Sequence, residues 1–146
     1  MKIGIGADHG GTELKEEVKK YLRDKNYETI DVGTWGTDPV DYPDIAEKVA
    51  ELVLSGQVDK GIVICGTGIG ISIAANKIPG IRCALLSDPW SAKMTRLHND
   101  TNMMALGAGV VGENLALEIV DVWVGTEFSG EERHQRRIDK VMALEK

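Results

Sequence analysis

The sequence predicts a three-layer α/β fold of the Rossmann-like or flavodoxin-like kind, with a five-stranded, mostly parallel sheet and helices on both faces. Short runs rich in β-branched residues alternate with stretches whose apolar residues recur at helical spacing. The chain has 146 residues, of which 42% are hydrophobic, and this suits one compact domain with a sizeable core. We therefore expect a single domain over residues 1–146, with right-handed crossovers between parallel strands.

The expected elements alternate along the whole chain. Strands are expected at 2–8, 28–33, 61–66, 82–87 and 103–111. A helix is expected after each strand. Apolar residues at helical spacing indicate the first two helices, with Leu14, Val18 and Leu22 in the first and Ile45, Val49 and Val53 in the second. The next three are expected from about Gly70, after Asp88-Pro89 and over 113–124. Asp88 and Pro89 favour a helix start, because aspartate caps free N–H groups and proline fits the first turn. A last helix is expected over 131–144.

Composition excludes several classes of protein. The formal net charge of -6 argues against a nucleic-acid-binding scaffold. No apolar run reaches the roughly 18 residues that a membrane helix needs, and the opening MKIGIGADHG does not resemble a secretory leader. We therefore expect a soluble cytoplasmic protein. The two cysteines, Cys65 and Cys83, are too few for a disulfide framework and are expected to be free thiols.

Polar residues and glycines follow each expected strand. They are Asp8-His9-Gly10-Gly11, Gly33-Thr34, Cys65-Gly66-Thr67-Gly68, Ser87-Asp88 and Gly107. Open α/β sheets bind their ligands outside the carboxyl ends of the strands. The sequence therefore predicts a ligand site at this edge of the sheet.

The stretch GIVICGTGIGIS, residues 61–72, leads from a strand into a glycine-rich loop. It lacks the third glycine of a dinucleotide fingerprint, and the chain has no G-x-x-x-x-G-K-[ST] motif. A run of N–H groups at a helix N-terminus suits a phosphate, an oxyanion or an enolate. The same helix end favours the thiolate of Cys65. From these residues alone, the commoner interpretation of Cys65 is a small buried apolar side chain at a strand end.

Histidines and arginines are the other candidates. His9 follows the first strand, His98 ends a helical stretch, and each is either a ligand contact or ordinary polarity at its position. Arg133 and Arg137 stand at i and i+4 beside His134, so they share a helix face that fits a phosphate or a solvated surface. No spacing resembles a metal-ligand motif, and neither a metal nor a cofactor is expected.

These residues together resemble the B-type ribose-5-phosphate isomerases, a family that includes the subunits of galactose-6-phosphate isomerase. The resemblance covers nearly the whole chain. It is carried by Asp8-His9, Asp41-Tyr42-Pro43, the run from Cys65 to Lys77, Gly80-Ile81-Arg82, His98-Asn99-Asp100-Thr101-Asn102 and Arg133-His134-x-x-Arg137.

The resemblance implies an aldose–ketose isomerase that interconverts ribose 5-phosphate and ribulose 5-phosphate through an enediolate. Cys65 is similar to the family's general base, which moves a proton between C2 and C1 of the open-chain sugar. His98, with Thr67, is similar to the group that opens the furanose ring. The substrate-binding residues implied are Asp8, His9, Tyr42, Gly66, Gly68, Gly70, Ser72, Asn99, Arg133 and Arg137.

The resemblance also implies a homodimer with an active site shared across its interface. His98, Asn99, Arg133 and Arg137 would then come from the neighbouring chain, and a pairing of dimers into a tetramer stays open. The partner implied is a small sugar phosphate, without nucleic acid, membrane or cofactor.

Two departures from the family pattern bear on the substrate. Glu131-Glu132 precede Arg133 where members usually have glycines, and Gly109 stands where many members have arginine. Six-carbon aldose phosphates, such as allose 6-phosphate or galactose 6-phosphate, are therefore an alternative. From other classes, a non-catalytic flavodoxin-like ligand-binding domain and a hydrolase with Cys65 as nucleophile stay open.

Overall fold

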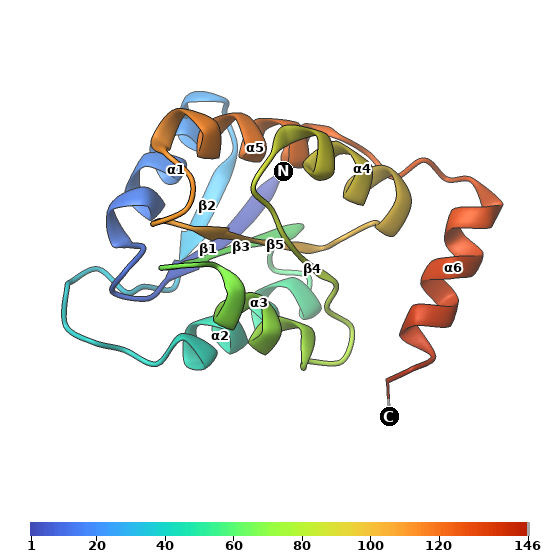
Figure 1. Ribbon diagram of the computed structural model, residues 1–146, viewed down its shortest axis with the longest axis horizontal. Coiled ribbons are helices and arrows are strands. Elements are labelled where there is room, and N and C mark those ends of the chain that lie inside the picture. The colour runs from blue at the N-terminus through green and yellow to red at the C-terminus, as the bar shows by residue number, and fades with distance from the viewer. Residues whose placement is uncertain (146) are drawn as a thin grey trace.

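The computed structural model describes residues 1–145, so Lys146, the last residue of the expected domain, lies outside the described residues. Within that range the chain forms five strands and six helices (Figure 1). The strands are β1 (Lys2–Ala7), β2 (Glu28–Asp31), β3 (Lys60–Cys65), β4 (Cys83–Leu85) and β5 (Met103–Gly107). The helices are α1 (Thr12–Asp24), α2 (Tyr42–Leu54), α3 (Ile69–Asn76), α4 (Pro89–Asn99), α5 (Glu113–Gly125) and α6 (Glu132–Met142).

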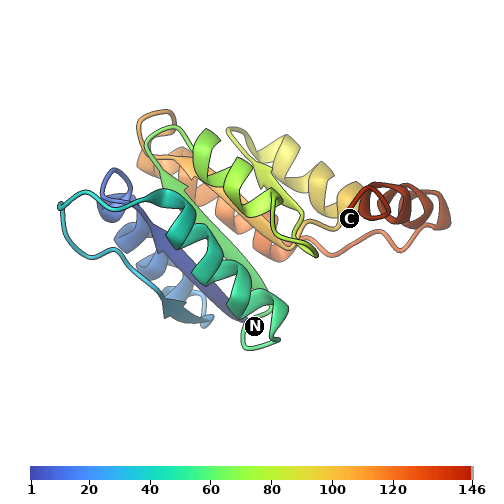
Figure 2. The same cartoon turned by 90° about the horizontal axis from the view of Figure 1, so that it is seen from below.

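The strands form one sheet in the order β2-β1-β3-β5-β4, and every neighbouring pair is parallel. Figure 1 shows α1, α4 and α5 on one face of this sheet and α2 and α3 on the other, which confirms the predicted three-layer fold. The view in Figure 2 looks onto the layer of α2 and α3. The chain passes from β1 outward to β2 and then back to β3, so the carboxyl ends of β1 and β3 flank the point where strand order reverses.

The central strands are buried on both faces, because a helix layer covers each face of the sheet. Ile62 and Ile64 of β3 join the core under α1 and α5, whereas Val63 and Cys65 join the core under α2 and α3. Successive side chains of β3 therefore point to opposite faces of the sheet and belong to two separate cores. One of them reaches the carboxyl end of β3 and buries Cys65, which is 5% exposed.

The expected strand at 103–111 is wrong in its second half, since β5 ends at Gly107. The N–H groups of Ala108 and Gly109 donate to the carbonyl oxygens of Cys65 and Gly66. The N–H of Val110 donates to the Gly107 carbonyl oxygen and closes a turn. Apolar composition suggested a longer strand, but these bonds take the chain across the end of β3 instead.

Helix α6 packs against α4 and stands beside the sheet instead of covering it (Figure 1). It begins at Glu132 and ends at Met142, so it is shorter at both ends than the expected 131–144. Among residues 1–145, no helix is both long enough and apolar enough to cross a membrane.

Candidate active site

The sulfur of Cys65 lies at the N-terminus of α3. Cys65 is the last residue of β3, and the N–H of Gly68 donates to its Sγ at 3.1 Å. Gly68 has φ +77°, a conformation that an L side chain rarely adopts, and this turns its N–H back toward the sulfur. The sulfur thus accepts a backbone N–H at the N-terminus of α3, where the helix dipole has its positive end.

The loop after Cys65 is held by the end of β5. Ala108 and Gly109 donate to the carbonyl oxygens of Cys65 and Gly66 at 2.9 Å each. The Thr67 backbone packs so closely on Gly107 that a Cβ at position 107 would collide with it. Thr67 Oγ1 accepts from the N–H of Ile69, the first residue of α3, at 3.2 Å. The backbone geometry of the loop is thus set by the neighbouring strand.

Asp8 and His9 lie beside this loop, after β1. The Asp8 N–H donates to the Ile64 carbonyl oxygen, and Asp8 Oδ1 accepts from the Gly10 N–H at 2.9 Å. His9 Nδ1 accepts from the N–H of Val40 at 3.3 Å. That bond leaves the proton of a neutral His9 ring on Nε2, so the ring can donate to a ligand.

Tyr42 and Ser72 complete this group of residues. The Tyr42 ring lies against the backbone of Gly70, where an added Cβ would be 2.7 Å from Cζ. Ser72 is buried, and its hydroxyl donates to the Ile69 carbonyl oxygen at 2.7 Å. The structure therefore gathers nine of the predicted site residues around the carboxyl ends of β1 and β3. They are Asp8, His9, Tyr42, Cys65, Gly66, Thr67, Gly68, Gly70 and Ser72.

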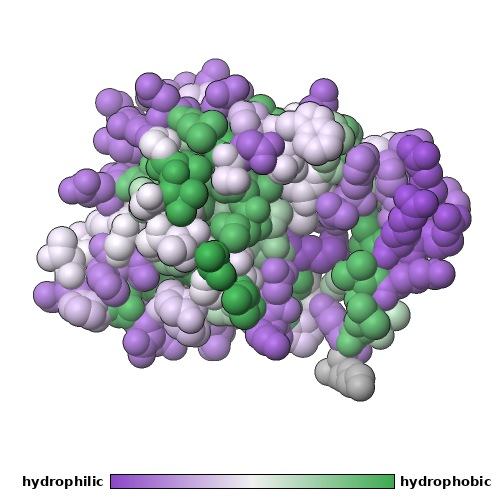
Figure 3. All heavy atoms as spheres, viewed as in Figure 1, coloured by the Kyte–Doolittle hydropathy of each residue, from purple (hydrophilic) through white to green (hydrophobic). Residues whose placement is uncertain are grey.

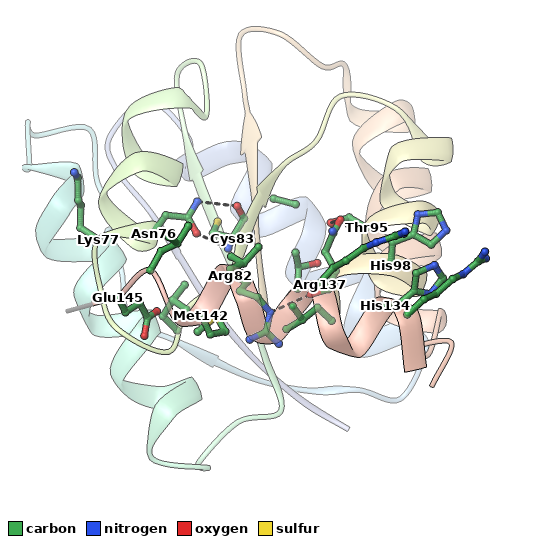
Figure 4. Close-up of a pocket in the computed structure, with 18 residues that line it drawn as sticks. Asn76, Lys77, Arg82, Cys83, Thr95, His98, His134, Arg137, Met142 and Glu145 are labelled. Carbon is green, nitrogen blue, oxygen red and sulfur yellow. Dashed lines mark hydrogen bonds between the residues drawn. The ribbon is translucent and has the colours of Figure 1, made fainter. Parts of the chain in front are cut away.

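The other four predicted residues, His98, Asn99, Arg133 and Arg137, line a cavity of about 970 Å³ between α6 and the α3–β4–α4 side of the sheet. Figure 4 shows His98 and Arg137 projecting toward this space from α4 and α6. Asn99 Oδ1 accepts from Thr95 Oγ1 at 3.0 Å. The cavity combines cationic side chains with an apolar wall that includes Ile138 and Val141.

Two further residues of this cavity were not predicted as site residues. The His134 ring lies 4.5 Å from the His98 ring between centroids, and its Nδ1 is 2.7 Å from Ser129 Oγ. Burial lowers the pKa of His134, an effect that the nearby Glu131 opposes. Arg82 donates to the carbonyl oxygens of Asn99 and Asp100. Arg82 and His134 both stand inside motifs quoted above, but no local pattern indicated the contacts that they make.

The two groups of residues lie at opposite ends of the parallel strands. Cys65 pairs with Gly107 at the carboxyl end of β5, whereas α4 ends at Asn99, just before Met103 opens β5. Met103 and Gly107 are four steps apart along β5, which corresponds to a rise of about 13 Å. Cys65 and His98 of one chain therefore do not meet in one site.

No group of three or more His, Cys, Asp or Glu side chains within residues 1–145 is arranged to hold a metal ion. Cys65 and Cys83 are both free thiols in the part of the chain that the structure describes. Burial raises the pKa of the Cys83 thiol to about 12, so Cys83 stays protonated at neutral pH.

Comparison with known proteins agrees with the motifs. Residues 3–141 match the family model described as Ribose/Galactose Isomerase. Ribose-5-phosphate isomerase B of Escherichia coli (strain K12) is 51% identical over 99% of this chain and 96% of its own length.

Two solved structures share the fold over almost their full length. That of ribose-5-phosphate isomerase B from Clostridium thermocellum is 57% identical and has a TM-score of 0.96, over 99% of this chain and 97% of that one. A ribose 5-phosphate isomerase from Thermotoga maritima is 48% identical with a TM-score of 0.95, over 98% of both chains. This chain, with its Cys65 loop and its Arg133-His134-x-x-Arg137 helix, therefore belongs to the ribose/galactose isomerase family.

Proposed function

We propose that this protein interconverts ribose 5-phosphate and ribulose 5-phosphate. The observation that carries the proposal is the Cys65 sulfur at the N-terminus of α3, which receives the Gly68 N–H at 3.1 Å. A thiolate next to a row of backbone N–H groups combines a base with a site for the negative charge that the base creates. The ribose-5-phosphate isomerases to which the chain is similar support the choice of sugar.

In the proposed reaction, the Cys65 thiolate removes the proton from C2 of the open-chain aldose. The electron pair of that C–H bond forms the C1–C2 double bond of an enediolate. The negative charge moves to O1, and N–H groups of the Gly66–Gly70 loop stabilise it. The thiol then returns a proton to C1 while the O2 proton passes to O1, so that O2 becomes the ketone oxygen and O1 the hydroxyl oxygen of the ketose.

The remaining residues bind the sugar phosphate at both of its ends. Asp8 and Tyr42 accept or donate at the sugar hydroxyls, and His9 contacts the phosphate through Nε2–H. Arg133 and Arg137 contribute paired charges to the phosphate. His98, with Thr67, opens the furanose ring, and Asn99 supports the enediolate.

This assignment requires a second copy of the chain, because His98 and Cys65 of one chain lie at opposite ends of the parallel strands. Apolar side chains support such a copy, since Ile69, Ile73 and Leu85 are each about half exposed. Figure 3 shows apolar side chains gathered in the middle of one face and along α6. A homodimer would cover them and bring His98, Asn99, Arg133 and Arg137 of one chain to Cys65 of the other.

The test of the chemistry is proton NMR of ribose 5-phosphate with the protein in D₂O. Isomerisation gives ribulose 5-phosphate, with deuterium at C1 to the extent that the Cys65 thiol exchanges with solvent before it returns the proton. A hydrolase would instead release inorganic phosphate, and a non-catalytic flavodoxin-like domain would leave the sugar unchanged. Either of these results would overturn the proposal.

The test of the shared site is complementation between two variants impaired on ribose 5-phosphate, Cys65→Ala and His98→Asn, in one preparation. Each heterodimer would have one site with both residues intact, and half of the randomly formed dimers are heterodimers. Co-expression should therefore restore about a quarter of the unaltered activity. Activity that stays at the level of the separate variants would place both residues in a site within one chain.

Six-carbon aldose phosphates are a second candidate substrate, because Gly109 leaves space beside the loop. Gly109 is exposed, and its N–H donates to the Gly66 carbonyl oxygen at 2.9 Å. A side chain at this position would lie over the mouth of the site and compete with an added carbon of the substrate.

A further inference from the structure

Lys15 is a charged residue buried inside the protein, away from the residues to which the reaction is assigned. Its side chain on α1 is fully buried. Its Nζ lies 3.0 Å from Asp31 Oδ1, 2.6 Å from the Thr34 carbonyl oxygen and 5.1 Å from the centroid of the Trp35 ring. A buried ammonium costs free energy unless acceptors surround it, so these contacts define one position for it.

Asp31 gathers further donors at the end of β2. It accepts from the Gly33 N–H at 2.8 Å, from Trp35 Nε1 at 3.0 Å and from Lys19 Nζ at 2.8 Å. Burial alone would raise the pKa of Asp31, but hydrogen bonds from two lysines and the Gly33 N–H outweigh burial and lower it. Asp31 is therefore an anion at neutral pH, paired with Lys15.

Lys15 and Asp31 together hold the start of the loop 33–41, which joins β2 to α2. The loop is exposed at most of its positions, including Trp35, which is 65% exposed. An exposed loop with few apolar contacts depends on polar contacts for its order. Thr12 Oγ1 adds one such contact by donating to the Gly36 carbonyl oxygen at 3.0 Å.

The far end of the same loop meets the candidate active site. The Val40 N–H donates to His9 Nδ1, and Tyr42, whose ring lies against Gly70, directly follows the loop. The contacts of Lys15 and Asp31 therefore hold one end of a segment whose other end holds two proposed substrate contacts.

We propose that Lys15 and Asp31 are positioning residues for the isomerisation, which hold the loop 33–41 so that His9 and Tyr42 stand in place to bind the sugar phosphate. The inference rests on the proposed function, which makes those two residues substrate contacts. A loop that is in place for only a fraction of the time weakens the apparent affinity by that fraction. The chemical step at Cys65 is affected less, because none of these contacts reaches the sulfur.

Lys19 offers a matched control. Its Nζ binds Asp31 Oδ2 at 2.8 Å, as closely as Lys15 binds the carboxylate, but its hydrogen bonds go to carboxylates alone and not to the loop. Lys15→Met and Lys19→Met each remove one ammonium from Asp31. Only Lys15→Met also removes the bond to the Thr34 carbonyl oxygen.

The experiment measures kcat and KM for ribose 5-phosphate, together with the Kd for the same sugar by calorimetry and the melting temperature. Lys15→Met should raise KM and Kd about tenfold and change kcat by about twofold or less. Lys19→Met should change KM by less than about twofold, and Lys15→Arg should recover part of the affinity. Trp35→Leu, a surface change that does not threaten folding, should raise KM by about two- to fivefold.

A merely structural role would give a different result. Lys15→Met would then lower the melting temperature and leave KM and Kd at their unaltered values, which would overturn the inference. Equal effects of Lys15→Met and Lys19→Met would overturn it as well. If Lys15→Met does not fold, Trp35→Leu tests the role of the loop instead. An unchanged KM and Kd in Trp35→Leu would refute that role. An unaltered protein that binds the sugar phosphate without isomerising it would count against the proposed function instead, and the comparison of Kd values would still test the positioning.

Discussion

The N–H of Gly68 donates to the sulfur of Cys65 at 3.1 Å, and Gly68 adopts a left-handed conformation to do so. A glycine is required there because a Cβ would lie 2.6 Å from a methyl carbon of Leu85 and 2.8 Å from the backbone of Leu106. The contact gives the sulfur a donor within its own loop. It also explains why a small, flexible residue follows the cysteine at this spacing.

Cys65→Ala should abolish isomerisation and leave sugar-phosphate binding nearly unchanged, because the variant removes the proposed base and keeps the proposed phosphate contacts. Activity is measured by a coupled assay and binding by calorimetry. Cys83→Ala is the matched control and should keep its activity, since its thiol is buried and protonated. Turnover near the unaltered rate in Cys65→Ala would refute the role of Cys65 as base.

His98→Asn should slow the turnover of ribose 5-phosphate, which is mostly cyclic, more than that of a substrate fixed in the open-chain form. The reason is that ring opening needs a proton donor at the ring oxygen, whereas proton transfer between C2 and C1 uses Cys65. Steady-state rates on both substrates check this. An equal loss on both would contradict the separate roles.

Arg137→Ala should raise KM by about one to two orders of magnitude, which corresponds to the loss of a charge-assisted contact of about 1.5–3 kcal/mol. Arg136 is the matched control, because it pairs with Glu132 on another face of α6 and does not line the cavity. Arg136→Ala should leave KM within about twofold of the unaltered value. Similar effects of both variants would point to a general loss of positive charge on α6.

Gly109→Arg should shift preference toward ribose 5-phosphate over allose 6-phosphate, since a guanidinium at the mouth takes the space of a sixth carbon. The backbone allows the change, because the φ of Gly109 is not positive and an added Cβ would lie 3.2 Å from the Gly66 carbonyl oxygen. That contact needs only a small shift of the loop. The measurement is kcat/KM for both sugars with both proteins. An unchanged ratio of the two values would mean that position 109 does not discriminate between the sugars.

Lys60→Met should change the stability of the protein more favourably at pH 7 than at pH 10. Burial is the main cause that lowers the pKa of Lys60 to about 8, with the charge of Arg96 adding to it. Below pH 8 the amine is charged in both states, and the folded state bears the cost of burying it. Above the usual pKa near 10.5 it is neutral in both states, so the cost disappears between these values as pH rises.

The gain expected from Lys60→Met at pH 7 relative to pH 10 is on the order of 1–2 kcal/mol, after allowance for solvent screening. Lys60 Nζ also donates to the Val124 carbonyl oxygen at 3.3 Å, and the variant loses this bond at both pH values. The difference between the two pH values therefore isolates the charge. Chemical denaturation of both proteins at each pH measures it, and a pH-independent difference would contradict the lowered pKa.

The order of strands and helices and the place of Cys65 at a strand end were predictable from the sequence. These features depend on periodicity and on the residues that follow each strand, which are properties of neighbours along the chain. The capping of α4 by Asp88 is a local feature of the same kind, since its Oδ1 accepts from the Ser91 N–H at 2.7 Å.

Only the tertiary structure decided which distant residues meet. It placed His98 at the amino end of β5, far from Cys65, because α4 runs back along the sheet before β5 begins. It also brought Lys15 to Asp31 and Thr34, a set of contacts that the helical pattern around Leu14 and Val18 did not indicate. The partner of a buried charge depends on which segments the topology brings together, and periodicity along the chain contains no information about that.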